Sequence, residues 1–422
     1  MKVQLLLTGN EIMSGDTVDS NSALMARRLS ELAIGIHRKV TVGDDVELLK
    51  TELAAMAADA DLIIMNGGLG PTIDDLTAEI LAAVAGVPTV EHAAAVTHLE
   101  QWCGRRNLQL NAANRKQAML PEGAKIIDNP IGSAVGFELN VGNCRVMCTP
   151  GVPSELAVML DIIVDDLAAT LAQPAQRNTL RLQTFGLGES TAQQIISDAV
   201  PDWPAEVELG FRAGAPQMEL KLTIDNSEAL PLQAQCREKL ESLFGDHIIG
   251  EGDTLLAARV LQLLGERGAT LTTAESCTGG LIASMLTRIP GSSTSFHAGF
   301  VTYANAIKHS VLGVSNEVLD QPGAVSEACV IQMAEGAMKR SGADYAIAVS
   351  GIAGPDGGSK DKPVGTVWLA WGSADNIRTR CLHWPVERSL FQTMIAAAGL
   401  DMIRRALLGL EEEPLYFKQR SA

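Results

Sequence analysis

The sequence is poor in aromatic residues and in positive charge, and it has no long apolar run. Aromatic residues make up 4% of the 422 residues, and the formal net charge is −17. An acidic chain lacks the basic face that contacts with phosphate backbones require, which argues against nucleic acid or an anionic membrane as the main partner. No apolar run approaches the roughly 20 residues that span a bilayer.

Cysteine is also scarce, and its spacing excludes a disulfide framework or a zinc motif. The seven cysteines are scattered, and Cys144 and Cys148, which flank a short apolar strand, are expected to be core residues. Lys2 is followed directly by a strand-like segment, so no secretory leader is expected at this start. Reduced thiols without a leader predict a cytoplasmic protein.

What the sequence does contain is an alternation of Ala-rich helices with Val, Ile and Leu strands, which is typical of α/β proteins. At 422 residues the chain is too long for one ordinary core. We predict an α/β domain at 1–170, a small α+β domain at 176–250 and a three-layer α/β domain at 253–412. The middle domain reads as β-α-β-β-α-β and has no G-x-x-G clamp, so we interpret it as a spacer or dimerisation module.

A glycine-rich turn in the first domain predicts a phosphate site. The apolar run Leu62–Met65 is expected to be a buried strand of a parallel sheet, and the chain then turns through Gly67, Gly68 and Gly70. Ligands of open parallel sheets bind at the carboxyl ends of strands, where glycines let the backbone approach a phosphate. The turn lies at such a strand end.

Acidic residues follow these glycines. We expect a helix to begin near Thr72, with Asp74, Asp75 and Thr77 in its early turns. Carboxylates beside a bound phosphate would repel it unless a divalent cation bridges them. Alternatively, the two aspartates only complement the helix dipole. A second turn of this kind precedes Glu155 at another predicted helix start, which favours a shared cleft.

The first domain resembles the molybdopterin-binding fold of the MoaB/MogA type, in the version found at the amino end of CinA proteins. The resemblance is carried by TGNEIMSGDTVDSN (8–21), VGDD (42–45), NGGLGPTIDDLT (66–77, where Asn66 departs from the commoner TGGLGPT) and TPGVPSE (149–155). It implies metal-dependent hydrolysis of ADP-ribose to AMP and ribose 5-phosphate, with Mg, Mn or Co as the cation. The residues it implies are Gly67, Gly68, Gly70 and Thr77 for phosphate, and Asp74, Asp75, Glu155 and Asp44 for the metal.

In the third domain, the run TTAESCTGGL (272–281) places Ser276 between a predicted strand and a predicted helix. Backbone N–H groups at a helix start lack intrahelical partners and are able to stabilise an oxyanion. Ser276 is therefore a candidate nucleophile, and the neighbouring Cys277 is the alternative because a thiol is intrinsically more reactive. A plain structural turn is the other interpretation.

A serine nucleophile needs a base. No G-x-S-x-G elbow is present, and His297 and His309 are candidates by proximity in sequence only, so a Ser-His-Asp triad is disfavoured. Tyr303 and Lys308 are a better pair, because a lysine with a lowered pKa acts as a base and a tyrosine relays protons. A solvated lysine and a core-edge tyrosine are the structural alternative.

The third domain resembles the carboxyl-terminal CinA domain, which is also the fold of PncC-type nicotinamide mononucleotide (NMN) deamidases. The resemblance is carried by AESCTGGL (274–281), VTYANAIKHSVLGV (301–314), VSGIAGPDGG (349–358) and KPVGTVW (362–368). It implies hydrolysis of the NMN carboxamide without a metal, with Ser276 as nucleophile and Lys308 and Tyr303 handling its proton. The substrate and oxyanion residues that we add are Thr278, Gly279, Gly280, Ser350, Gly351 and, for the nucleotide phosphate, Arg388.

The resulting hypothesis is a bifunctional hydrolase of pyridine-nucleotide recycling that acts on NMN and ADP-ribose. Two alternatives stay open: a ligand-binding or scaffold protein of the competence or DNA-damage response, and a first domain that binds molybdopterin. By resemblance, the middle domain is KH-like and the protein is a homodimer. From its acidic charge we expect it to bind neither nucleic acid nor membrane.

Overall fold

The computed structural model describes residues 1–170, 177–410 and 413–421. The chain divides into two compact units, Met1–Asn178 with Asp225–Ser227, and Thr179–Ile224 with Glu228–Ala422. The predicted boundary between the first two domains, at 170–176, falls largely outside the described residues. The predicted end of the third domain at 412 also lies outside them.

The first unit is built on a six-stranded sheet with the order β2-β1-β3-β8-β7-β6. Strands β2, β1, β3 and β8 are parallel. Strand β7 pairs antiparallel with β8, and β6 pairs antiparallel with β7. The parallel arrangement brings the carboxyl ends of β1, β3 and β8 to one edge of the sheet, where ligands bind in folds of this class. The strands are β1 (Val3–Thr8), β2 (Ile36–Val42), β3 (Leu62–Asn66), β6 (Lys125–Ile127), β7 (Gly136–Val141) and β8 (Cys144–Thr149).

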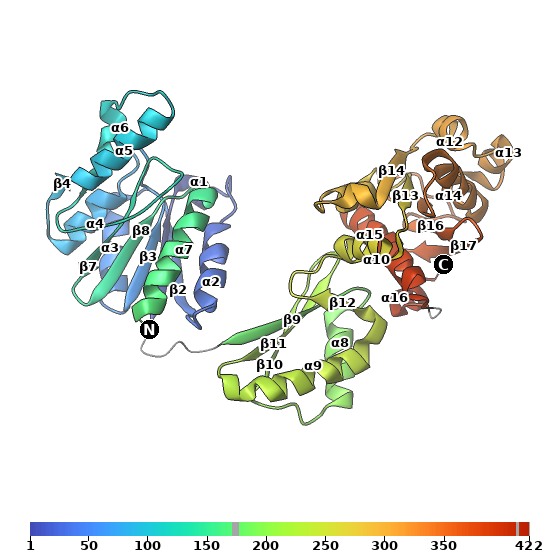
Figure 1. The fold of residues 1–422 in the computed structure, drawn as a ribbon, viewed down its shortest axis with the longest axis horizontal. Helices are drawn as coiled ribbons and strands as arrows, with labels where there is room; N and C mark the ends of the chain where they lie inside the picture. The colour runs from blue at the N-terminus through green and yellow to red at the C-terminus, as the bar shows by residue number, and fades with distance from the viewer. Residues whose placement is uncertain (171–176, 411–412, 422) are drawn as a thin grey trace. The chain divides into compact units, whose positions relative to one another are not determined.

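Helices cover both faces of this sheet (Figure 1). Helices α2 (Asn21–Ser30) and α7 (Pro153–Thr170) pack on one face, and α3 (Val46–Ala57), α4 (Thr77–Ala85) and α5 (Ala93–Arg105) belong to the core on the other. Both Cys144 and Cys148 are fully buried and free, which confirms their prediction as core residues. The shorter elements are α1 (Asn10–Met13), α6 (Ala112–Lys116), β4 (Thr89–Glu91) and β5 (Met119–Pro121).

The second unit contains two sheets. The smaller has the predicted β-α-β-β-α-β order, its strands lie in the order β10-β11-β9-β12, and α8 and α9 share its apolar core. Its elements are β9 (Asn178–Thr184), α8 (Glu189–Ala199), β10 (Glu208–Arg212), β11 (Met218–Ile224), α9 (Leu230–Phe244) and β12 (Ile248–Glu251).

The larger sheet of this unit has the order β14-β13-β15-β16-β17. Strands β14, β13 and β15 are parallel, β16 pairs antiparallel with β15, and β17 pairs antiparallel with β16. Helices α10, α11 and α15 share the core on one face, and α14 lies in the core on the other, next to α12 (Figure 1). The strands are β13 (Leu271–Glu275), β14 (Phe296–Val301), β15 (Tyr345–Gly351), β16 (Thr366–Ser373) and β17 (Asn376–His383). The helices are α10 (Leu256–Arg267), α11 (Leu281–Thr287), α12 (Asn305–Leu312), α13 (Asn316–Val318), α14 (Glu327–Ser341), α15 (Arg388–Leu408) and α16 (Leu415–Arg420).

The architecture is the multidomain α/β fold that the sequence predicts. The sequence pattern did not predict α16, whose Tyr416 and Phe417 are buried in the core of the larger sheet. Within the described part of the chain, none of the helices carries an apolar stretch long enough to cross a bilayer.

A close approach of two helices holds α12 in place. A Cβ atom added to Gly336 of α14 would lie 1.9 Å from the backbone oxygen of Leu312, the last residue of α12. Only glycine fits at this crossing, because the obstructing atom belongs to the backbone and not to a flexible side chain.

We therefore expect Gly336→Ala to destabilise the protein by about 1–3 kcal/mol through overpacking. Gly265→Ala in α10 is the matched control, since nothing lies within 4 Å of its added Cβ atom. That change is expected to stabilise by about 0.5–1 kcal/mol through the better helix propensity of alanine. Urea denaturation followed by circular dichroism measures both, and a Gly336→Ala variant as stable as the parent would contradict the close packing.

Candidate functional site

In the first unit, the carboxyl ends of the parallel strands enclose a cavity of about 580 Å³. Its lining includes Thr8 at the end of β1 and Gly9 after it, Gly67 and Gly68 after β3, and Gly151 after β8. The N–H of Gly67 donates to the backbone oxygen of Thr149 (3.0 Å), which ties the ends of β3 and β8 together. The edge of the sheet predicted to bind ligand is thus hollow, and residues at the ends of three strands line it.

The glycine turn after β3 has a shape that other residues adopt poorly. Gly67 and Gly68 have φ values of +107° and +65°, in the left-handed region. A Cβ atom on Gly68 would lie 2.5 Å from Thr77 Oγ1, and one on Gly70 would lie 2.5 Å from Asp75 Oδ2. The turn therefore packs directly against the residues that follow it and leaves its backbone facing the cavity.

The helix expected to begin near Thr72 begins instead at Thr77, so that part of the prediction is wrong. Asp75 accepts hydrogen bonds from the N–H (2.8 Å) and hydroxyl of Thr72, which folds residues 72–75 into a turn. Thr77 Oγ1 donates to the backbone oxygen of Gly67 (2.8 Å) and so holds the helix start against the glycine turn. Asp74 and Asp75 are loop residues and not members of a helical first turn.

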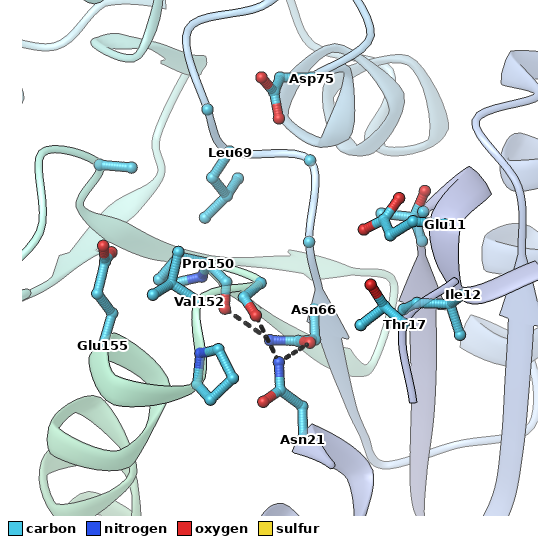
Figure 2. Close-up of a pocket in the computed structure, with 18 of the residues that line it drawn as sticks. Glu11, Ile12, Thr17, Asn21, Asn66, Leu69, Asp75, Pro150, Val152 and Glu155 are labelled. Atoms are coloured by element: carbon cyan, nitrogen blue, oxygen red, sulfur yellow. Dashed lines mark hydrogen bonds between the residues drawn. The ribbon is translucent and has the colours of Figure 1, made fainter. Parts of the chain in front are cut away.

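The four carboxylates expected to hold a cation line the same cavity but do not converge. Figure 2 shows Asp75 and Glu155 on different sides of it, with Glu11 on a third side. Asp44 accepts from Thr8 Oγ1 (2.9 Å), and Glu155 accepts from Asn129 Nδ2 (2.8 Å). Among the described residues, no three histidine, cysteine, aspartate or glutamate side chains form a group that could hold a metal ion. Asp44, Asp74, Asp75 and Glu155 are therefore not a preassembled metal cage.

Two asparagines that sequence reasoning did not assign to the site lie at the base of this cavity (Figure 2). Asn66 Nδ2 donates to Thr149 Oγ1 (3.1 Å) and to the backbone oxygen of Pro150 (2.7 Å). Asn21 Nδ2 donates to Asn66 Oδ1 (2.9 Å) and to the backbone oxygen of Gly151 (2.7 Å). The departure at Asn66 from the commoner motif was the available signal, but its partner lies 45 residues away in the chain.

In the second unit, Ser276 directly follows β13, a strand in which every residue is buried. Its N–H donates to the backbone oxygen of Val349 on β15 (3.0 Å), which fixes the start of the turn. Its hydroxyl oxygen lies 3.0 Å from Lys308 Nζ, and the two side chains are 8% and 1% exposed respectively. The structure thus brings together two predicted catalytic residues that are separated by 32 positions.

Lys308 is a buried lysine held by oxygen atoms. Its Nζ atom donates to the backbone oxygens of Thr302 (2.7 Å) and Tyr303 (3.1 Å), in addition to the contact with Ser276. Burial lowers the pKa of Lys308 below its ordinary value, and the thiols of Cys329 and Cys277 offset part of that shift. A lysine whose neutral form is favoured in this way is able to accept a proton from the serine hydroxyl.

Tyr303 meets Lys308 through its backbone and not through its side chain. The side chain is 60% exposed, and its hydroxyl accepts a hydrogen bond from Arg388 Nη2 (3.1 Å). Arg388, the first residue of α15, also donates to the backbone oxygen of Gly354 (2.7 Å). In the described residues no carboxylate lies within ion-pair distance of this guanidinium, so its charge is available to a ligand.

The helix-start donors predicted to bind an oxyanion are partly used within the protein. The Gly280 N–H donates to Glu275 Oε2 (3.0 Å), and the Gly279 N–H donates to the backbone oxygen of Ser276 (3.1 Å). The Thr278 hydroxyl also donates to Glu275 Oε2 (2.7 Å). Gly280 is therefore not free to act as an oxyanion donor, and Glu275 is a site residue that sequence reasoning missed.

The remaining candidates are placed as follows. Ser350 is buried, and its hydroxyl donates to the backbone oxygen of Ala324 (2.7 Å), while Gly351 ends β15. His297 is exposed on β14, and His309 Nδ1 lies 2.8 Å from the backbone oxygen of Val314. Neither histidine has a hydrogen bond to Ser276 in the described residues.

Cys277 faces the core and not the lysine contact. Its side chain is 3% exposed and belongs to the apolar core shared by α10, α11 and α15. Burial raises the pKa of this thiol to about 12, so it stays protonated at neutral pH. The geometry therefore favours Ser276 over Cys277 as the nucleophile.

Two protein families match separate parts of the chain. The family described as CinA C-terminal domain matches residues 253–407, and the probable molybdopterin binding domain matches residues 4–169. Among solved structures, a CinA superfamily protein from Klebsiella pneumoniae is 38% identical and covers 36% of this chain and 96% of its own, with a TM-score of 0.36. The competence/damage inducible protein CihA from Agrobacterium tumefaciens is 44% identical over 36% of this chain and 93% of its own, with a TM-score of 0.35.

Full-length relatives are also found. A CinA-like protein from Shewanella denitrificans is 40% identical, and the match covers 97% of this chain and 96% of the relative. A CinA-like protein from Colwellia psychrerythraea is 50% identical over 424 residues, which cover 100% of this chain and 98% of the relative. The chain therefore belongs to the family of CinA-like proteins, with a molybdopterin-binding-type domain followed by a CinA C-terminal domain.

Proposed function

We propose that the second unit hydrolyses the carboxamide of NMN to nicotinate mononucleotide and ammonia. The observation that carries this proposal is the 3.0 Å contact between Ser276 Oγ and the buried Lys308 Nζ. A hydroxyl is a weak nucleophile unless an adjacent base removes its proton, and Lys308 is placed to do so.

In the proposed reaction, Lys308 takes the hydroxyl proton as Ser276 Oγ attacks the carboxamide carbon. The tetrahedral intermediate collapses, Lys308 returns the proton to the leaving nitrogen, and ammonia departs. Water then attacks the resulting ester as its proton passes to Lys308, the bond between the acyl carbon and Ser276 Oγ breaks, and Lys308 returns the proton to Ser276 Oγ as nicotinate mononucleotide is released. The predicted oxyanion donors are the N–H groups of Thr278, Gly279 and Gly280, or that of Gly351. We assign the Thr278 N–H, because those of Gly279 and Gly280 are engaged within the protein and Gly351 belongs to β15.

Arg388 and Tyr303 are assigned to the nucleotide. The guanidinium presents forked donors suited to a phosphate, and its bonds to Gly354 and to Tyr303 Oη hold it at the start of α15. The exposed Tyr303 ring offers a surface beside the phosphate. We place this side chain in substrate binding and leave proton transfer to Lys308.

We further propose that the first unit hydrolyses ADP-ribose to AMP and ribose 5-phosphate with a divalent cation. The backbone cradle at Gly67 and Gly68 suits a diphosphate, and the cavity of about 580 Å³ is within the range of nucleotide-sized sites. A magnesium-type ion is commonly held by one or two carboxylates together with substrate phosphates, so it needs no protein cage. Asp75 and Asp74, beside the glycine turn, would hold it, and the ion would offset the charge of the diphosphate.

The nucleophile is tested by comparing Ser276→Ala with Cys277→Ala in an assay of ammonia release from NMN. We expect the serine variant to lose at least about 1,000-fold in kcat, since its attacking oxygen is gone. The cysteine variant is expected to stay within about tenfold of the parent, because its buried thiol is protonated. A serine variant with full activity beside an inactive cysteine variant would reverse the assignment.

The pH dependence of deamidation tests the base. Because burial lowers the pKa of Lys308, kcat should rise with pH through that pKa, at a pH below that at which an ordinary lysine loses its proton. Below this pKa the ammonium has no lone pair and the rate falls. Lys308→Arg keeps a cation that never deprotonates, so we expect it to be inactive at every pH from 6 to 10. Activity in this variant with an unchanged profile would exclude Lys308 as the base.

Hydrolysis of ADP-ribose is tested by measuring AMP with Mg²⁺, with Mn²⁺ and with a chelator. We expect the chelator to abolish AMP formation and to leave deamidation unchanged. Asp75→Asn should lower AMP formation by about tenfold or more, because it removes a charge beside the glycine turn. Asp59→Asn is the matched control, since Asp59 forms a surface ion pair with Lys2 next to the amino end of β1. If neither product forms under any condition, the scaffold interpretation holds instead.

A further inference from the structure

Glu275, the last residue of β13, is a fully buried carboxylate that lies immediately before the nucleophile. Its Oε2 atom accepts from Thr278 Oγ1 (2.7 Å), the Gly280 N–H (3.0 Å) and the Ile282 N–H (3.1 Å). Its Oε1 atom accepts from the Ala283 N–H (2.9 Å) and from the hydroxyl of Thr273 on β13 (3.3 Å). One side chain thus collects four donors from the turn that contains Ser276 and from the first residues of α11.

The backbone of the same residue is bound to the lysine side of the site. The backbone oxygen of Glu275 accepts from the Thr302 N–H (2.9 Å), and the backbone oxygen of Thr302 accepts from Lys308 Nζ (2.7 Å). The side chain of Glu275 therefore contacts the turn that contains Ser276, and its main chain contacts Thr302, which in turn holds Lys308.

We infer that Glu275 is a positioning residue, whose buried carboxylate holds the 276–280 turn so that Ser276 Oγ stays in contact with Lys308. The inference rests on the proposed role of Ser276 as a nucleophile. The residue acts through the turn, since both of its oxygens are occupied by protein donors. From the other side, Gln392 Nε2 donates to the backbone oxygen of Cys277 (2.8 Å), so the turn is held at both ends.

The chemistry of the acceptor explains why a carboxylate is needed here. An ionised carboxylate only accepts hydrogen bonds and offers acceptor sites on both oxygens, so it is able to serve all of these donors at once. The N–H groups at the start of α11 also stabilise its buried negative charge. A glutamine would present one oxygen and an NH₂ group to the same donors, so at least one of them would lose its partner and the turn would shift.

This arrangement also keeps the carboxylate away from the base. In the described residues no carboxylate lies within ion-pair distance of Lys308, although Glu275 directly precedes its serine partner. A carboxylate paired with the lysine would favour its charged form. Because the Glu275 carboxylate is hydrogen-bonded to the start of α11, it does not pair with Lys308, and the neutral amine of Lys308 stays favoured.

The test uses a fluorophosphonate that labels active serines, so that it does not depend on NMN as the substrate. In this reaction, Ser276 Oγ forms a bond to phosphorus, the P–F bond breaks, fluoride leaves, and Lys308 takes the hydroxyl proton. We expect Glu275→Gln to slow labelling of Ser276 by about 100-fold, the scale of loss from a displacement of about 1 Å. With NMN, kcat should fall by a similar factor and KM should change less than about threefold, because Glu275 does not touch the substrate.

Asp344→Asn is the matched control. Asp344 is an exposed carboxylate that accepts from the N–H and hydroxyl of Thr270 (2.8 Å each) beside the opposite end of β13, so the change removes carboxylate contacts next to the same strand but away from the turn of Ser276. We expect it to label within about twofold of the parent. Equal slowing in both variants would mean that Glu275 acts only through general stability, and would overturn the inference.

A second pair of variants decides the question if Glu275→Gln does not fold. Thr278→Val removes one donor to Glu275 and keeps the shape of the side chain, whereas Thr287→Val removes a hydroxyl near the other end of α11 that donates to the backbone oxygens of Ala283 and Ser284 and not to Glu275. We expect labelling to slow about fivefold or more in the first and to stay within about twofold in the second. Parent-like labelling in a folded Glu275→Gln variant, or in Thr278→Val, contradicts the inference. A parent that is labelled at Ser276 but releases no ammonia from NMN contradicts the proposed substrate alone, and a parent that is not labelled contradicts both.

Discussion

The carboxyl-terminal site depends on a lysine placed where its charge is costly. A buried ammonium without a carboxylate partner is disfavoured, and that cost is what makes the neutral amine available beside a hydroxyl. Three oxygen atoms hold Lys308 Nζ, and α12, which carries the residue, packs on α14 at a crossing that admits only glycine. The rigidity of this packing is therefore part of the chemistry, since a lysine able to reach water would recover its charge.

Both units place their sites at the carboxyl ends of parallel strands, yet they use the backbone in different ways. After β3, the chain leaves a glycine turn facing an open cavity and begins α4 only at Thr77. After β13, a buried glutamate takes the donors at the start of α11 for the protein itself. The first arrangement suits an anionic ligand that must enter and leave, and the second suits a nucleophile that must not move.

Much of this could be read from the sequence, because strand periodicity, glycine turns and motif resemblance are local signals. They predicted the α/β class, the order of elements in the middle domain and the candidate pair Ser276 and Lys308. The start of α4 was misplaced because Asp75 bonds back to Thr72, and a side chain that competes with the helix leaves no mark in hydrophobic periodicity. The bond between Asn21 and Asn66 and the bonds of the Glu275 side chain were missed because they depend on how the chain folds in three dimensions.

The choice between two adjacent reactive residues shows how a single turn sets the chemistry. Ser276 and Cys277 are neighbours, and on reactivity alone the thiol would be the better nucleophile. The turn directs the hydroxyl to Lys308 and the thiol into the apolar core, where burial raises its pKa to about 12. A rotation of the turn by one residue would exchange these environments. The bonds of the Glu275 side chain to Thr278 and Gly280, and the bond of Gln392 to the backbone oxygen of Cys277, hold this turn in the orientation in which the hydroxyl and not the thiol contacts Lys308.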